Sequence, residues 1–181
     1  MKTIAVIDFE TTGLSPAMGD RATEVAIVLV QADKVVDRFQ SLMNAGVRVS
    51  AFIESFTGIS NAMVAHNASF DRKFWEAELR RVGVEARHPF ACTMLVSRRL
   101  YPNAPNHKLG SLVDFHHLPR FGQAHRAMAD AEMAAALLGQ IRSDVRSRFG
   151  VSQPGHELLV QMQKCAKHAL HALVQSHAAA C

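Results

Sequence analysis

The chain has few cysteines and no long hydrophobic run. Its three cysteines, Cys92, Cys165 and Cys181, are odd in number and lack CxxC spacing, so neither a disulfide framework nor a cysteine-ligated zinc site is predicted. No apolar stretch approaches the roughly 18 residues of a membrane span, and acidic residues interrupt the N-terminal segment where a signal peptide needs an apolar core. We therefore expect reduced thiols and a soluble, cytoplasmic protein with no membrane association.

The excess of positive over negative charge is also small. Twenty Lys and Arg residues stand against 16 Asp and Glu residues, which gives a formal net charge of +4. This is weak evidence for a phosphate-rich partner, because many basic proteins bind no nucleic acid. With 181 residues, 49% of them hydrophobic, the chain is long enough to bury a core. We expect a main domain over residues 1–149 and a helical extension over 150–181.

The hydrophobic pattern predicts alternating strands and helices. Runs rich in Val, Ile and Leu predict strands over residues 3–7, 23–30 and 34–42, the last two forming a hairpin at Asp33. Further along, the pattern predicts a helix over 55–63, a strand over 63–66, a helix from a Ser69 cap to Gly83, a strand over 90–93, a helix through Leu100, a helical segment over 107–116 capped by Asn106, and long helices over 127–149 and 156–180. The apolar seam of the last helix suits packing on the core, which we favour, or on a second copy of the chain.

The segment Asp8-Phe9-Glu10 follows the first apolar run. Because one residue separates the two acids, both side chains lie on the same face of a strand. Two carboxylates aimed at one point repel each other unless a cation lies between them. Such a pair is a weak signal by itself, since solvated acids at a strand end give the same pattern. The Thr-Thr-Gly turn that follows would offer backbone N–H groups to a phosphate or a terminal hydroxyl.

Three further residues extend this acidic set. Asp71 is expected in the first turn of its helix, where the helix dipole favours an acid for structural reasons as well. His125 and Asp130 are five residues apart, about 140° around a helix. A shared target therefore requires His125 to lie on the loop before the helix, and Gly122 and Gln123 make a loop plausible there.

The segments IDFETTG, HNASFD and HRAMADA have the order and local patterns of the DEDD exonuclease superfamily, His subtype. Within it, the chain most resembles the proofreading epsilon subunit of bacterial DNA polymerase III and its stand-alone relatives, over roughly residues 1–148. The resemblance implies an α/β, RNase H-like fold with a mixed central sheet flanked by helices. It also implies a metal-dependent 3′-to-5′ exonuclease that releases nucleoside 5′-monophosphates, with DNA as the expected substrate.

The resemblance also implies roles for individual residues. Asp8, Glu10, Asp71 and Asp130 would ligate two Mg²⁺ or Mn²⁺ ions, and Asp8 would bridge both. His125 would be the general base that takes a proton from the attacking water, a task that suits an imidazole with an ordinary pKa near 6.5.

The turn after the first motif is the expected substrate contact. By resemblance, the backbone at Thr12 and Gly13 would meet the 3′-terminal nucleotide and Leu14 would wedge against a terminal base. A Thr-Gly turn followed by a buried Leu would explain the same residues structurally. The chain departs from the family before HNASFD, where relatives carry a further helix and most of a strand. A true deletion at the Val64–Ala65 junction would remove a strand from the central sheet and expose core surface, which is energetically improbable. Segments joined across an omitted disordered loop would give the same sequence.

Other functions stay open at this point. One is an RNA 3′ exonuclease of the oligoribonuclease or RNase T type; others are a non-catalytic nucleic-acid-binding module on the same fold and a globular protein whose acids are surface charges. The complete set of four acids and a histidine counts against the last two. The expected partners are DNA or RNA 3′ ends. The tail after Phe149 shows no clamp-binding pattern, so a free-standing enzyme, a homodimer and a polymerase-associated subunit are all compatible with it.

Overall fold

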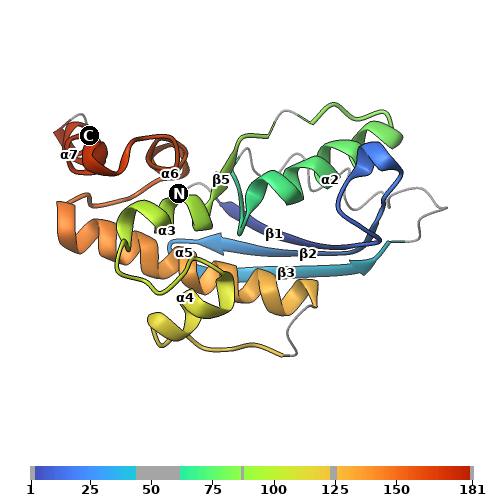
Figure 1. Ribbon diagram of the computed structural model, residues 1–181, viewed down its shortest axis with the longest axis horizontal. Helices are drawn as coiled ribbons and strands as arrows, with labels where there is room; N and C mark the ends of the chain where they lie inside the picture. Colours follow the sequence, from blue (N-terminus) through green and yellow to red (C-terminus); the bar gives the residue numbers. More distant parts are fainter. Residues whose placement is uncertain (1–2, 44–61, 87, 123–125, 180–181) are drawn as a thin grey trace.

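One mixed sheet lies between two layers of helices in the computed structural model (Figure 1), which describes residues 3–43, 62–86, 88–122 and 126–179. The sheet has the strand order β3-β2-β1-β4-β5. Its strands are β1 (Ile4–Thr11), β2 (Ala22–Gln31), β3 (Lys34–Leu42), β4 (Met63–Ala65) and β5 (Phe90–Cys92). The first three pair antiparallel, whereas β4 is parallel to β1 and β5 is parallel to β4. The predicted α/β class with a mixed central sheet is confirmed.

Helices cover both faces of this sheet. They are η1 (Pro16–Met18), α2 (Ala68–Arg81), α3 (Thr93–Leu100), α4 (Leu109–Phe115), α5 (Ala127–Phe149), α6 (His156–Met162), η2 (Lys167–Ala169) and α7 (Leu170–Ala179). Helix α2 packs on one face, while α5 crosses the other together with α3, α4, α6 and α7 (Figure 1). Within the described ranges, none of these helices combines the length and apolar character that crossing a lipid bilayer requires.

The alternation of side chains along β1 divides its residues between two cores. Val6 belongs to the core that α5 covers, and Ile7 belongs to the core that contains Phe74 of α2. Asp8 and Glu10 follow Val6 at intervals of two, so both lie on the α5 face. Because both faces are covered, the strand is apolar at nearly every position before these acids.

The predicted hairpin joins β2 to β3. Ala32 and Asp33 have φ angles of 50° and 62°, and a two-residue type I′ turn requires positive φ at both of its central residues. The Asp33 carboxylate then accepts hydrogen bonds from Arg142 and, at 2.7 Å, from Arg146. The tip of the hairpin is thereby fixed to α5.

The strand predicted over residues 63–66 is confirmed, one residue shorter, so the sheet keeps a strand at the Val64–Ala65 junction. Residues Met63–Ala65 form β4, which pairs with β1 on one side and β5 on the other. All three side chains are buried, and the strand lies between two others in the sheet although it is only three residues long. The helix predicted over residues 55–63 falls almost entirely outside the described residues, and Met63 belongs to β4.

The single long helix predicted over residues 156–180 is also wrong, because the segment is divided into α6, η2 and α7. Helix α6 ends before Gln163, whose side chain pairs with the edge strand β5. Its amide oxygen accepts the Cys92 N–H at 2.6 Å and its amide N–H donates to the Phe90 oxygen at 2.9 Å. The side chain thus satisfies edge groups that a neighbouring strand would otherwise bond. The break also lets Leu158 and Val174 reach the same core.

Two predicted helix caps are wrong as well. Asn67, with a φ of 65°, precedes α2, so Ser69 lies inside the helix rather than at its cap. Helix α4 begins at Leu109, later than predicted. The Asn106 side chain instead accepts the Lys108 N–H at 2.9 Å, an Asx turn that precedes the helix. In contrast, α5 has the predicted bounds.

Candidate active site

The first two acids lie inside a strand rather than after it. Strand β1 was predicted to end at Ile7, but it continues to Thr11 and therefore includes Asp8 and Glu10. In the antiparallel register Glu10 lies opposite Glu24 of β2, and the pairing shifts immediately after Glu10. Irregularities of this kind bend a strand at the point where it leaves the sheet, often beside a functional site.

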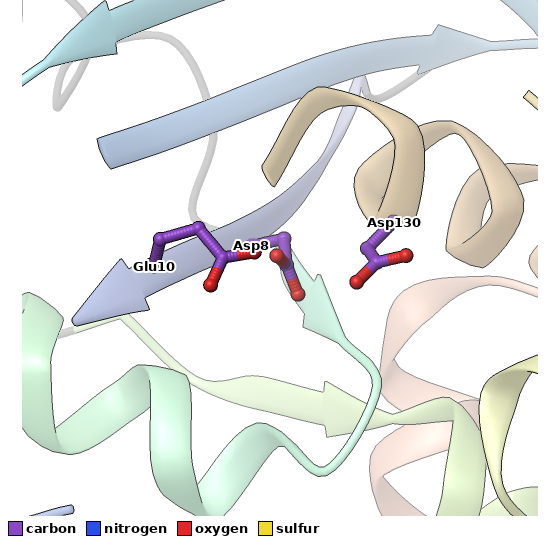
Figure 2. A group of neighbouring side chains, drawn as sticks. All are labelled: Asp8, Glu10 and Asp130. Atoms are coloured by element: carbon purple, nitrogen blue, oxygen red, sulfur yellow. The ribbon is translucent and has the colours of Figure 1, made fainter. Parts of the chain in front are cut away.

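Asp130 brings the third carboxylate from the opposite layer. It lies in the first turn of α5, which packs against β1 and β2. Ligand oxygen atoms of Asp8, Glu10 and Asp130 all lie within 4.8 Å of one another, and Figure 2 shows the three side chains gathered between β1 and α5. Residues more than 100 positions apart in the sequence thus converge at one point.

Asp71 is the most deeply buried of the four predicted acids. It lies in the first turn of α2, just beyond the end of β4, with an exposed fraction of 2%. Burial raises the pKa of Asp71 to about 7, although hydrogen bonds from its own backbone N–H and from that of Phe9 act in the other direction. Burial also raises the pKa of Asp8 well above its usual range, followed by the charges of Asp71, Asp130 and Glu10.

This crowding determines what the site can hold. Four carboxyl groups in a partly buried place repel one another, and each proton or cation that enters lowers that repulsion. All the donors are hard carboxylate oxygens, the ligands that Mg²⁺ and Mn²⁺ prefer. The cluster of Asp8, Glu10 and Asp130 therefore fits a divalent metal ion, with Asp71 beside it.

Glu24 was not predicted as a functional residue, yet it lies next to this cluster. Burial raises its pKa, but hydrogen bonds from Gln40 and Arg126 and the backbone N–H of Ala127 outweigh burial and lower it. The Arg126 Nη2 lies 3.3 Å from the Glu24 Oε1. Since Ala127 is the first residue of α5, Glu24 caps that helix from strand β2. Its signal in the sequence is a single acid in the apolar run of β2.

The histidine of the HNASFD segment has a structural environment. The His66 Nε2 donates to the His107 carbonyl at 3.0 Å, so Nδ1 is left to accept from the Thr93 hydroxyl at 2.9 Å. Burial lowers the pKa of His66 to about 4. The neutral imidazole joins the end of β4 to the start of α3 and to the segment before α4, and thereby supports the turn that leads to Asp71.

The predicted substrate turn is held by its own hydrogen bonds. Thr12 exchanges bonds with Arg21, its N–H donating to the Arg21 carbonyl at 2.9 Å and its hydroxyl accepting the Arg21 N–H at 3.0 Å. A Cβ at Gly13 would lie 2.5 Å from the Asp20 carboxylate, so only glycine fits there without movement. The structural alternative for Leu14 is wrong, because its side chain is 77% exposed rather than buried.

His125 lies outside the described residues. The next residue, Arg126, is described and is the one that pairs with Glu24. The structure therefore brings together the four predicted acids, while the role of His125 stays a prediction.

Comparison with known proteins identifies the family. A family model described as "Exonuclease" matches residues 5–65 and 61–138, most of the chain. The chain belongs to the exonuclease family. It is 31% identical over 187 aligned positions to the 3′-5′ exonuclease DinG of Bacillus subtilis (strain 168), covering 90% of this chain and 19% of DinG. It is 33% identical over 172 positions to the PolC-type DNA polymerase III of the same strain, covering 81% of this chain and 12% of that polymerase. The chain thus spans a fifth or less of these curated relatives.

Solved structures of exonucleases share the fold. Exonuclease X in complex with 5′ overhanging duplex DNA matches with a TM-score of 0.62 and 25% identity, over 88% of this chain and 99% of that one. The nuclease domain of 3′hExo, described as a DEDDh family member bound to rAMP, matches with a TM-score of 0.58 and 17% identity, over 79% of this chain and 92% of that one. The predicted RNase H-like fold is confirmed.

The comparisons also bear on the junction before HNASFD. The two stretches that match the exonuclease family overlap at residues 61–65, and the alignment with DinG extends over more positions than this chain has residues. Relatives therefore contain residues that this chain lacks. The shortening nevertheless leaves β4 and its pairing intact.

Proposed function

We propose that this chain is a metal-dependent exonuclease that removes nucleoside 5′-monophosphates from the 3′ end of DNA. The observation that carries the proposal is the convergence of Asp8, Glu10 and Asp130 within 4.8 Å, with buried Asp71 beside Asp8. Family membership and the likeness to Exonuclease X, which was solved with duplex DNA, support the reaction and the choice of DNA.

In this proposal the four acids hold two Mg²⁺ or Mn²⁺ ions. Bound there, the ions would offset the carboxylate charges, polarise the scissile phosphate and stabilise the leaving oxygen. The protein supplies the positions: β1 fixes two acids on one face, α5 contributes the third, and the first turn of α2 contributes the fourth. Since the acids come from three elements, the site exists only in the folded chain.

The proposed general base is His125, which would take the proton of the attacking water. Arg126 and Ala127 follow it directly in the sequence. Glu24 pairs with the Arg126 side chain and accepts a hydrogen bond from the Ala127 backbone. The base is therefore one residue away from a point fixed on strand β2. A positioned base is worth about 10² to 10⁴ in rate.

The proposed substrate contacts are the Thr12–Leu14 turn and its exposed leucine. A large apolar side chain that is 77% exposed gains free energy when it contacts a base, so its position suits a wedge against the terminal base. Thr12 and Gly13 belong to a turn whose backbone bonds are already formed, so it requires little ordering when a nucleotide arrives.

The experiment is digestion of 5′-labelled oligonucleotides. Single-stranded DNA, duplex DNA with a mismatched 3′ end and short RNA are incubated with Mg²⁺, Mn²⁺ or EDTA, using the wild type and the Asp8→Ala variant. The expected result is a ladder that shortens from the 3′ end, requires metal and is absent in Asp8→Ala. Asp37→Ala, which removes an exposed acid on β3, is the matched control and should retain activity.

Each other outcome has a definite meaning. Faster digestion of RNA than of DNA would assign the chain to the oligoribonuclease or RNase T type. Binding of oligonucleotides without digestion by the folded, metal-loaded wild type would refute the enzyme and leave a nucleic-acid-binding module. Equal digestion by Asp8→Ala would show that the acidic cluster is not the catalytic site.

A further inference from the structure

A groove of about 400 Å³ lies between η1 and α2, beside the Thr12–Leu14 turn and apart from the acidic cluster. Pro16 and Ala17 of η1 line one side of it, and Ala77 lines the other. Lys73, Arg80 and Arg81 also line it, and all three side chains are exposed. We call this feature the η1–α2 groove.

The sequence of α2 explains the shape of the groove. Lys73, Ala77, Arg80 and Arg81 are spaced at i, i+4, i+7 and i+8, so they lie along one face of the helix. The small side chain of Ala77 leaves room between the long basic ones. At 1.5 Å per residue, Lys73 and Arg81 lie roughly 12 Å apart along the helix. The groove therefore follows α2 from Lys73, two residues beyond Asp71, to Arg81 at the end of the helix.

The charge of the groove is positive. The one acid in its lining, Glu76, is already paired with Arg72 at 2.6 Å. Arg81 lies 3.9 Å from Glu78, but Glu78 makes its shorter contact, 2.9 Å, with Arg21. Three exposed cations around a hollow whose acid is already engaged attract a polyanion.

Lys73 connects the groove to the proposed substrate turn. Its Nζ donates to the backbone carbonyl of Leu14 at 3.1 Å and lies 5.3 Å from the centre of the Phe70 ring. If Leu14 contacts the terminal base, the phosphates that precede that base pass near Lys73. Because phosphates of a stacked strand follow one another at about 3.4 Å along its axis, a path of roughly 12 Å accommodates roughly four phosphates.

We propose that the η1–α2 groove binds the phosphodiester backbone of the digested strand over about four nucleotides upstream of its 3′ end. The inference rests on the proposed function and adds a substrate property to it. Lysine and arginine contacts to phosphates supply affinity without reading the sequence. The groove therefore makes activity depend on strand length and on salt, and not on the identity of the bases.

The test compares a dinucleotide with an eight-nucleotide single strand of DNA, at 50 and 200 mM salt. Arg80→Gln/Arg81→Gln removes two charges, and Ala77→Leu fills the groove while it keeps every charge. Lys164→Gln/Lys167→Gln removes two exposed charges elsewhere, one after α6 and one at the start of η2, and is the matched control.

Both groove variants should raise KM for the octanucleotide about tenfold at 50 mM salt, with kcat and dinucleotide hydrolysis changed less than twofold. The slope of log(kcat/KM) against log salt should be shallower by about 1.4 in the arginine variant. Each phosphate contact to a single strand contributes about 0.7 to this slope, and the variant removes two contacts. The control should match the wild type. Equal losses on both substrates, or no loss on the octanucleotide, would overturn the inference.

The design separates this inference from the proposed function. If the wild type hydrolyses neither substrate with metal, the proposed function fails. If it hydrolyses both and the folded groove variants behave like the wild type, only the groove assignment fails. A duplex with a recessed 3′ end is assayed beside the two single strands, and a loss confined to it would place the complementary strand in the groove and refute its assignment to the digested strand.

Discussion

Replacing the buried acid Asp71 by asparagine should stabilise the metal-free protein while it abolishes activity. The pKa of Asp71 moves from an ordinary 3.8 to about 7 on folding, mainly because burial disfavours the charged form. A group with a raised pKa in the folded state contributes stability below pH 3.8 and loses it as the pH rises through 7. The difference between the two pKa values corresponds to roughly 4 kcal/mol in the free energy of unfolding, or on the order of 10 °C in Tm for a domain of this size.

The assay is thermal unfolding in EDTA from pH 4 to pH 8.5, for the wild type and for Asp71→Asn. The stability of the wild type relative to the variant should fall by roughly 4 kcal/mol across this range. Taking the difference between the two proteins cancels the titration of groups that do not interact with Asp71. At pH 8, Mg²⁺ at a hundred times its Kd should stabilise the wild type by about 2.7 kcal/mol and the variant much less.

Asp37→Asn, which changes an exposed acid on β3, is the control and should follow the wild type at every pH. The reasoning is refuted if the stability difference between wild type and Asp71→Asn is independent of pH. It is also refuted if the variant gains as much stability from Mg²⁺ as the wild type does, because Asp71 would then take no part in holding the metal.

Three further predictions concern residues around the cluster. Glu24→Ala removes the ion pair with Arg126 and the cap of α5, so it should lower the free energy of unfolding by about 2 kcal/mol and weaken Mn²⁺ binding. Glu24→Gln should lose less of both. Urea unfolding and metal titration measure the two effects. The pKa of His66 is lowered to about 4, so stability should fall by up to about 3 kcal/mol as the pH drops from 6.5 to 4, and His66→Asn should lack this slope in urea unfolding. Leu14→Ala should change stability by less than about 0.5 kcal/mol because the side chain is exposed, and should slow digestion of duplex ends more than of single strands.

Periodic patterns in the sequence predicted most of the strands and helices of the fold. The Val and Ile runs predicted β2 and β3 closely, since both strands obey strong local preferences and meet in a turn that they specify themselves. The bounds of α5 also follow from local signals, with apolar residues at helical spacing and Gly150 at a φ of 72° after its last residue.

The elements that depend on distant partners could not be predicted in this way. The segment 156–180 has helical periodicity throughout, but its division around Gln163 depends on hydrogen bonds to β5, some 70 residues earlier. Strand β4 was predicted to within one residue, but its place in the sheet follows from pairing with β1 and β5, which the sequence does not show. Local patterns carry no information about such partners.

The same distinction applies to the acidic site. The acids at positions 8, 10, 71 and 130 were found because they lie in motifs, whereas Glu24 lies in no motif and was missed. Its structural role is visible only in the folded chain. Glu24 lies opposite Glu10 in the sheet, caps the helix that carries Asp130, and pairs with the arginine that follows His125. A carboxylate so close to the others would add to their repulsion if it were unpaired. Arg126 and Gln40 engage that charge, so Glu24 can fix α5 on the sheet without competing for the metal.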